Sequence, residues 1–299
     1  PKKPGIHVFE DYDLEKLVGT IDWTPFFMAW ELKGLYPKIL ESAKYGEEAR
    51  KVFNDGQAML AEIISKKLFT AKAVVGIFRA ESQGDDIHLY DEDDNHLETL
   101  CMLRMQVKRK PTLKNFCLAD FIAPKGNVQS DWMGSFAVTT GFGVDELAKS
   151  YEEAGDDYNS IMAKVIGDRL AESFAEHMHA RVRKELWAYV PTEDLSNALL
   201  IKEKYAGVRP APGYPACPDH TEKAKLWKLL NVDANIGLSL TEHFAMYPTA
   251  AVSGWYFANP KSQYFGVGKI KKDQVLDYAT RKGWDLETAE RWLAPNLGY

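Results

Sequence analysis

The sequence predicts an α+β fold: a single large domain with a mainly antiparallel, twisted sheet flanked by helices. Short apolar runs at 73–79 and 87–90 have the length and composition of strands, and an acidic turn follows the second at 91–95. Apolar residues at three- and four-residue steps predict a long helix over 156–189. Because no linker-like stretch divides residues 26–299, these elements are expected to share one core.

Composition and charge exclude several classes of protein. The chain has 299 residues, 45% apolar and 27% charged, enough to bury a core. Its 37 basic and 43 acidic side chains give a net charge of −6, so we expect no nucleic-acid partner. The apolar run at 73–78 is about a third of the roughly 20 residues that span a bilayer, so we expect no membrane segment. Cys101, Cys117 and Cys217 lie far apart, as expected of free thiols in the cytoplasm.

The N-terminal half is expected to combine an arm, helices and strands. Residues 1–25 are punctuated by proline and glycine and predict an N-terminal arm or linker; we expect the chain to be a piece of a longer protein. Helical patterns run over 29–68, with Asp55 as a possible N-cap. Further strands are predicted at 118–122 and 136–140.

Gly141 and Gly143 precede a helix, as in a dinucleotide-binding turn. The third glycine of that pattern is replaced by Glu146, which would place a carboxylate near a phosphate, so we reject a Rossmann dinucleotide site. On the long helix, Asp168, Glu172 and His179 share one face, for which a solvated stripe is the favoured interpretation from periodicity alone.

Residues 205–218 form the most unusual stretch of the sequence. Four prolines and two glycines exclude a helix or a central strand, so a rigid, shaped loop is expected. Such a loop usually either links domains or holds backbone groups toward a ligand. The embedded Arg209 and Tyr214 keep the ligand alternative open.

The C-terminal part is expected to hold a helix at 221–230, three strand-like stretches and a helical hairpin. The strand-like stretches are 237–244, 252–257 and 264–270. The hairpin helices are predicted at 273–281, ended by Gly283, and from an Asp285 N-cap to residue 293. The lysines at 269–272 could mimic a nucleic-acid-binding helix-turn-helix, but a packing hairpin fits the acidic chain better.

The usual catalytic signatures are missing from the sequence. It holds no G-x-S-x-G elbow, no H-E-x-x-H pair, no phosphate-binding G-x-x-x-x-G-K-[ST] loop, and no cysteine and histidine spacing typical of a metal site. What remains is a set of arginine, carboxylate and aromatic side chains around the rigid loop, which favours binding over self-contained catalysis.

Several runs closely resemble the C-terminal activation domain of cobalamin-dependent methionine synthase. The resemblance covers nearly the whole chain, and so many matches in one order are more specific than any single motif. The runs are IDWTPFF at 21–27, CLADF at 117–121, DDYN at 156–159, RPAPGYP at 209–215, DHTEK at 219–223, AVSGWYF at 251–257 and DQVLDY at 273–278.

The resemblance implies that the chain binds S-adenosylmethionine (AdoMet) and presents it to cobalamin held by a neighbouring domain of the same polypeptide. Cobalamin accidentally oxidised to cob(II)alamin is then restored to methylcobalamin by an electron from a flavodoxin-like protein or flavoprotein reductase and a methyl group from AdoMet. The chain would thus be a cytoplasmic methyltransferase fragment of methionine biosynthesis. The alternative is a separate AdoMet-binding reactivation protein that acts in trans. By the same analogy, the cobalamin-ligand motif D-x-H-x-x-G and the zinc site, both missing here, lie upstream.

The resemblance also implies the binding residues. Arg209 matches the position that contacts the AdoMet carboxylate, and Asp22 the position that pairs with its ammonium group. Glu172 and Glu203 match carboxylates near the ligand, where negative charge favours the ammonium and the sulfonium. Main-chain groups of the proline loop, including those of Ala211 and Gly213, are expected to contact the adenine. Tyr214 is expected on the side of the ligand that faces cobalamin. Tyr264 and Phe265 match an aromatic pair that lines the same pocket.

No general acid or base is required for such a reaction. A reduced cobalt centre is a strong nucleophile, and a methyl sulfonium needs no protonation before its sulfur leaves. Catalysis would therefore consist mainly of positioning.

Overall fold

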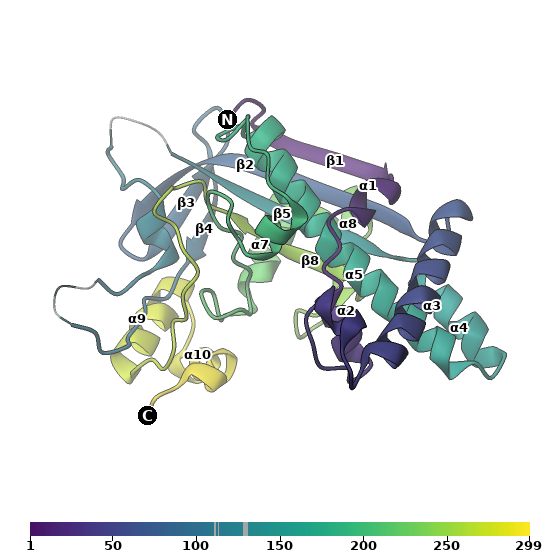
Figure 1. The fold of residues 1–299 in the computed structure, drawn as a ribbon. Helices are drawn as coiled ribbons and strands as arrows, with labels where there is room; N and C mark the ends of the chain where they lie inside the picture. The colour runs from purple at the N-terminus through teal and green to yellow at the C-terminus, as the bar shows by residue number, and fades with distance from the viewer. Residues whose placement is uncertain (111, 113, 128–130) are drawn as a thin grey trace.

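A six-stranded antiparallel sheet runs through the middle of the molecule (Figure 1). The computed structural model describes residues 1–110, 112, 114–127 and 131–299. The strand order is β4-β3-β2-β5-β8, and β1 pairs with β2 off this path. The strands are β1 Gly5–Tyr12, β2 Thr70–Gln83, β3 Asp86–Tyr90, β4 His96–Cys101, β5 Asp131–Phe142 and β8 Ala251–Tyr256.

Strand β2 organises the sheet because it pairs with three neighbours. Along one edge of β2, the first half pairs with β1 and the second half pairs with β3. The other edge of β2 pairs with β5. Side chains alternate between two cores: Val75 packs in one and Val74 in the other. The continuous apolar run predicted for this segment is thus confirmed as a strand that is buried on both faces.

One face of the sheet is covered by a helical layer around α5, which packs against β5 and β8 and against several other helices (Figure 1). The helices of this layer are α1 Glu15–Val18, α2 Thr24–Ala29, α3 Gly46–Ser65, α4 Val144–Glu153 and α5 Asp157–Arg181. The π-helix η3 Val182–Leu186 continues α5. The 3₁₀ helix η1 Lys38–Glu41 lies beside α3.

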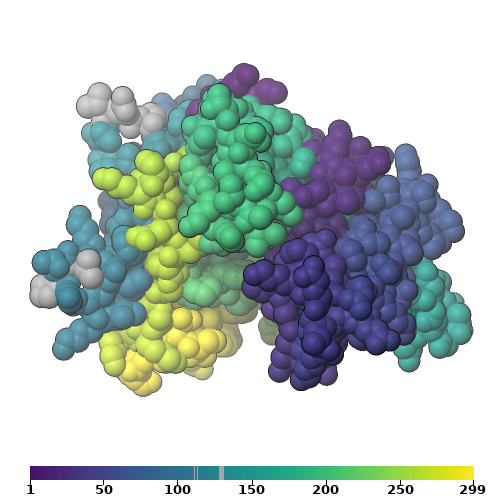
Figure 2. All heavy atoms as spheres, viewed as in Figure 1, coloured from purple at the N-terminus to yellow at the C-terminus, as the bar shows by residue number. Residues whose placement is uncertain are grey.

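The opposite face is covered by α7 Glu222–Leu230 and α8 Val232–Ile236. A third core lies beneath α9 Lys272–Lys282 and α10 Leu286–Trp292. On the face shown in Figure 2, the green middle segment lies between N-terminal segments in purple and C-terminal segments in yellow. Among the described residues, no helix has the length and apolarity that crossing a membrane requires.

The predicted antiparallel α+β fold is confirmed, with corrections in three predicted strands. Residues 118–122 were expected as a strand but form the 3₁₀ helix η2 Leu118–Phe121, because the Asp120 carboxylate accepts the Cys117 amide at 2.9 Å and closes the turn. In 237–244 only β6 Ser239–Leu240 is a strand; it pairs with β7 Met246–Tyr247. Residues 264–270 form no strand beyond a bridge at Ile270, since Gly268 takes a left-handed φ of +73°.

The helix predictions need smaller corrections. Asp55 is no N-cap: α3 already begins at Gly46, and Asp55 accepts a hydrogen bond from the Tyr158 hydroxyl at 2.8 Å. The long helix ends at Arg181 and continues as a π turn rather than reaching 189. Asp285 does cap α10, and Gly283 ends α9 with a left-handed φ of +69°, as predicted.

Residues expected as an N-terminal arm contribute β1 to the sheet. The extended segment pairs from Gly5 opposite Ile77 to Tyr12 opposite Ala71. Upstream of β1, the Lys2 and Lys3 amides donate to the carbonyls of Trp187 and Leu186. The domain boundary predicted at residue 25 stays a prediction.

Candidate functional site

A cavity of about 320 Å³ lies beside α5, between the segment that leads into α2 and the segment that follows α6 Asn197–Ile201. Four of the nine predicted site residues line this cavity, namely Asp22, Glu172, Glu203 and Arg209. They come from three parts of the chain that only the folded state brings together. The remaining lining residues are Thr20, Pro25, Arg169, Ser173, Glu176, Leu200 and Ile201.

The cavity is acidic but not uniformly so. Four carboxylates face two guanidinium groups across its walls, and the excess negative charge favours a ligand that carries net positive charge. The Asp22 carboxylate also accepts the Thr24 amide at 2.9 Å, which fixes it at the start of α2. The cavity can therefore hold a cationic group and an anionic group of the same ligand at different places.

Arg209 is held by several protein groups. Its Nη2 lies 2.8 Å from Oε2 of Glu176, and its Nη1 donates to the Tyr205 hydroxyl at 2.9 Å. Nη1 also lies 3.3 Å from Nδ1 of His179. Burial and the positive charges of Arg183 and Arg209 keep the pKa of His179 well below its usual range, so His179 is a neutral acceptor.

Glu176 and Tyr205 were missed by sequence reasoning. Glu176 lies one helical turn after Glu172, so the spacing that put Glu172 on an acidic face could have found it. Tyr205 begins the proline-rich loop, where nothing in the sequence fixes the direction of its side chain. His179, which helical periodicity places on a solvated stripe, is instead fully buried and stacks on Tyr256 at a ring distance of 5.0 Å.

The carboxyl group of the predicted site residue Glu172 has a raised pKa. Its desolvation by the surrounding protein raises its pKa above the usual value, the nearby Arg169 lowers it, and Asp168 raises it further. The side chain keeps an open side toward solvent. A positively charged ligand beside Glu172 would replace the lost hydration and favour the ionised form.

The proline loop is shaped by its own backbone hydrogen bonds. The Gly213 amide donates to the Cys217 carbonyl at 2.7 Å, and the Tyr214 amide donates to the Ala211 carbonyl at 3.1 Å. The Trp255 amide anchors the loop to β8 through the Pro210 carbonyl at 2.9 Å. Within the described part of the chain the Ala211 amide has no partner, so the loop has a donor left for a ligand.

Gly213 cannot be replaced without strain. It has a left-handed φ of +92°, and a Cβ there would lie 2.3 Å from the His220 ring. We expect Gly213→Ala to lower the free energy of unfolding by about 1–3 kcal/mol, measured by denaturant titration. Gly155→Ala is the matched control, because Gly155 also has a left-handed φ, of +74°, but open space at its Cβ position. Equal losses in the two variants would show that the His220 contact does not matter.

The two aromatic residues Tyr264 and Phe265 lie in different environments. The Tyr264 hydroxyl accepts the Arg209 amide at 3.0 Å and lies 3.2 Å from the Tyr205 hydroxyl, so Tyr264 adjoins the cavity. Phe265 does not: its ring packs against Phe116 and Phe121 at centroid distances of 5.9 and 6.3 Å. Neighbouring residues of an extended segment face opposite sides, so only one of the pair reaches the cavity.

Comparison with known proteins identifies the family. The family model described as the activation domain of vitamin B12-dependent methionine synthase matches residues 13–283. The chain belongs to this activation domain family. A solved structure, the crystal structure of the MetH reactivation domain bound to AdoHcy, is 51% identical and superimposes with a TM-score of 0.96, covering 99% of this chain and 91% of that one.

The family resemblance and the fold inferred from the sequence are therefore confirmed. The activation domain is the reactivation module of cobalamin-dependent methionine synthase, and a separate protein acting in trans is not favoured. The assignment of individual residues to the ligand remains a prediction.

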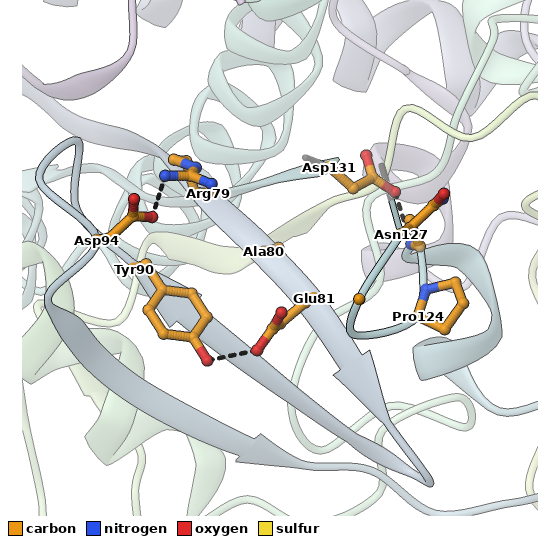
Figure 3. A pocket seen from close by; sticks show the side chains of 10 residues that line it. Arg79, Ala80, Glu81, Tyr90, Asp94, Pro124, Asn127 and Asp131 are labelled. Atoms are coloured by element: carbon orange, nitrogen blue, oxygen red, sulfur yellow. Dashed lines mark hydrogen bonds and ion pairs between the residues drawn. The ribbon is translucent and has the colours of Figure 1, made fainter. Parts of the chain in front are cut away.

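Two other hollows among the described residues are lined by none of the predicted site residues. One, of about 290 Å³, lies between β2, the end of β3 and the segment around Pro124 (Figure 3). Its polar side chains satisfy one another: Arg79 pairs with Asp94, and the Tyr90 hydroxyl donates to Glu81 at 2.6 Å. In a larger hollow of about 730 Å³, the Arg104 side chain is engaged by Asp85 and Asp120. The cavity beside α5 is thus the better ligand site.

Proposed function

We propose that this activation domain binds AdoMet in the cavity beside α5 and presents its methyl group to cobalamin held by a neighbouring domain. The observation that carries the proposal is the convergence of Asp22, Glu172, Glu203 and Arg209 on one cavity. AdoMet carries a carboxylate, an ammonium and a sulfonium, so its net charge of +1 complements the acidic excess of the walls. The similar reactivation domain bound AdoHcy, the same molecule without the methyl group.

The amino-acid end of the ligand lies between Arg209 and Asp22 in this proposal. The guanidinium makes a two-pronged contact with the ligand carboxylate, and the Asp22 carboxylate pairs with the ammonium. Glu172 and Glu203 place negative charge near the ammonium and the sulfonium. Each charged group of the ligand thus meets an opposite charge from a different part of the chain.

The adenine lies along the proline loop. The free Ala211 amide and the Gly213 backbone supply polar contacts, and the Tyr264 ring supplies a wall. A loop already fixed by its own hydrogen bonds loses little conformational entropy when the ligand binds.

The methyl group points out of the cavity toward the partner domain. Tyr214 is 63% exposed and Ile201, which lines the cavity, is 47% exposed, so apolar surface is available on this side for the cobalamin-binding domain. Cobalamin held by the neighbouring domain would supply the metal centre that takes up the methyl group and leaves AdoHcy, and the one electron that this reductive methylation requires would reach the cobalamin from a flavodoxin-like protein or flavoprotein reductase. This chain's residues bind and orient the donor, and no proton transfer is assigned to them.

The pH dependence of binding tests the role of Glu172. Its ionised form attracts the sulfonium, so AdoMet affinity falls as pH falls through the raised pKa of this carboxyl. Calorimetric titration over a series of pH values from 7 downward should show AdoMet affinity falling by about fivefold, or about 1 kcal/mol, as this carboxyl becomes protonated. The affinity for AdoHcy, which lacks the sulfonium charge, should change less with pH.

Glu172→Gln should remove most of that pH dependence and narrow the preference for AdoMet over AdoHcy. Glu146→Gln, on the exposed first turn of α4, is the control and should leave both affinities unchanged. A parent protein that binds AdoHcy and AdoMet with the same pH profile would contradict this assignment.

A further inference from the structure

The orientation of Arg209 is set by protein contacts before any ligand arrives. A guanidinium has five N–H donors. The two N–H groups of Nη1 face the Tyr205 hydroxyl and Nδ1 of His179. The Nη2 atom pairs with Glu176. Within the described part of the chain, Nε has no partner. Nε and the second Nη2 donor are therefore left for an anion.

Glu176 lies between two arginine side chains. Its side chain is 9% exposed, and its Oε1 lies 4.0 Å from Nη1 of the fully buried Arg183. Arg183 in turn pairs with Glu193 at 2.8 Å. The result is a chain of alternating charges, from Arg209 at the cavity through Glu176 and Arg183 to Glu193. Because each buried charge has an opposite neighbour, none of them can turn away without leaving another unpaired.

The other acidic residues of the cavity differ from Glu176 in their exposure. Glu172 and Glu203 are exposed, and Asp22 is partly exposed, so these carboxylates can meet a ligand directly. Glu176 is buried and its Oε2 already lies within 2.8 Å of Arg209. This carboxylate is placed to act on Arg209 rather than on the ligand.

We propose that Glu176 is a positioning residue, which fixes the Arg209 guanidinium so that its remaining edge meets the carboxylate of the ligand's amino-acid end. The inference rests on the proposed AdoMet site and adds to it a residue that does not touch the ligand. Removing the Glu176 charge frees the guanidinium to rotate, and the two-pronged contact is lost.

The test compares two ligands on one variant, Glu176→Gln. AdoMet carries the carboxylate, whereas decarboxylated AdoMet keeps the sulfonium, the amine and the adenosine. We expect calorimetry to show AdoMet binding about tenfold more weakly to the variant than to the parent, as for the loss of a charge-assisted contact. The dissociation constant of decarboxylated AdoMet should stay within about twofold of the parent value, which also shows that the variant is folded.

Two outcomes would overturn the positioning role. Equal weakening of both ligands would mean that Glu176 contacts the amine or supports the fold in general, and unchanged affinity for both would mean that Arg209 needs no such support. Glu185→Gln, which removes a carboxylate paired with Arg181 at 2.8 Å outside the cavity, is the matched control and should affect neither ligand.

A double-variant cycle separates this inference from the proposed function. If Arg209→Ala already removes the carboxylate contact, adding Glu176→Gln should cost no further AdoMet affinity. A full additional loss would contradict the positioning role. Unchanged AdoMet affinity in Arg209→Ala alone would instead contradict the proposed site.

Discussion

Arg209→Ala is expected to weaken AdoMet binding by about 1.5–3 kcal/mol, or roughly 10- to 150-fold. In the proposed site the Arg209 guanidinium is the partner of the ligand carboxylate, and its truncation also leaves Glu176 without its 2.8 Å ion pair. Calorimetric titration of the purified protein measures the effect. Asp22→Asn, which removes the proposed partner of the ligand ammonium, should lower the affinity to a similar extent.

Arg181→Ala is the matched arginine control. Arg181 pairs with Glu185 and lies over the Phe9 ring rather than in the cavity, so AdoMet affinity should not change in this variant. If Arg209→Ala and Asp22→Asn both bind AdoMet like the parent, the ligand does not occupy this cavity in the proposed orientation.

The largest expected effect on stability is that of Lys282→Met. The Lys282 Nζ lies 2.6 Å from Glu222 and 3.1 Å from Asp219, and all three side chains are at most 4% exposed. Burial lowers the pKa of Lys282, but the two carboxylates outweigh it and raise the pKa overall. Removing the cation takes the ion pair from the buried Asp219 carboxylate and leaves Glu222 with Lys225, 2.8 Å away, as its remaining ion-pair partner, so we expect a loss of about 3–5 kcal/mol in the free energy of unfolding.

Denaturant titration measures this loss, with Lys272→Met on the exposed first turn of α9 as the control. The triple variant Lys282→Met, Asp219→Asn, Glu222→Gln should recover much of the stability, because it removes the uncompensated charges together. A loss below about 1 kcal/mol in Lys282→Met would contradict the account of this cluster.

The same cluster predicts an acid sensitivity. Burial raises the pKa of Asp219, but Lys282 and hydrogen bonds from Tyr278 and Thr221 lower it overall. The stability it contributes is therefore fully present above the unfolded pKa of about 3.9 and is lost as pH falls through the lower folded value.

Much of the fold could be predicted from local patterns. The apolar run at 73–79 predicts a strand, and the capping residue Asp285 predicts the start of a helix. Both elements are found in the structure. The secondary-structure predictions fail where one local sequence pattern is compatible with two different structures. Residues 118–122 are apolar enough for a strand, but the hydrogen bond that the Asp120 carboxylate accepts from the Cys117 amide favours a turn instead.

Only part of the candidate site could be predicted from the sequence. The residues matched by resemblance include four that line one cavity, and Tyr264 adjoins it. Phe265 does not reach it, because the direction of a side chain in an irregular segment depends on packing against Phe116 and Phe121. Glu176 was missed because its role depends on Arg209, which is distant in the sequence.

The structure of the protein with bound AdoMet tests the central claim most directly. We expect the ligand carboxylate within hydrogen-bond distance of Arg209, its ammonium beside Asp22, and its methyl group directed outward on the Tyr214 side. AdoMet bound instead in the hollow beside Arg79 or in the one beside Arg104 would contradict the proposed site.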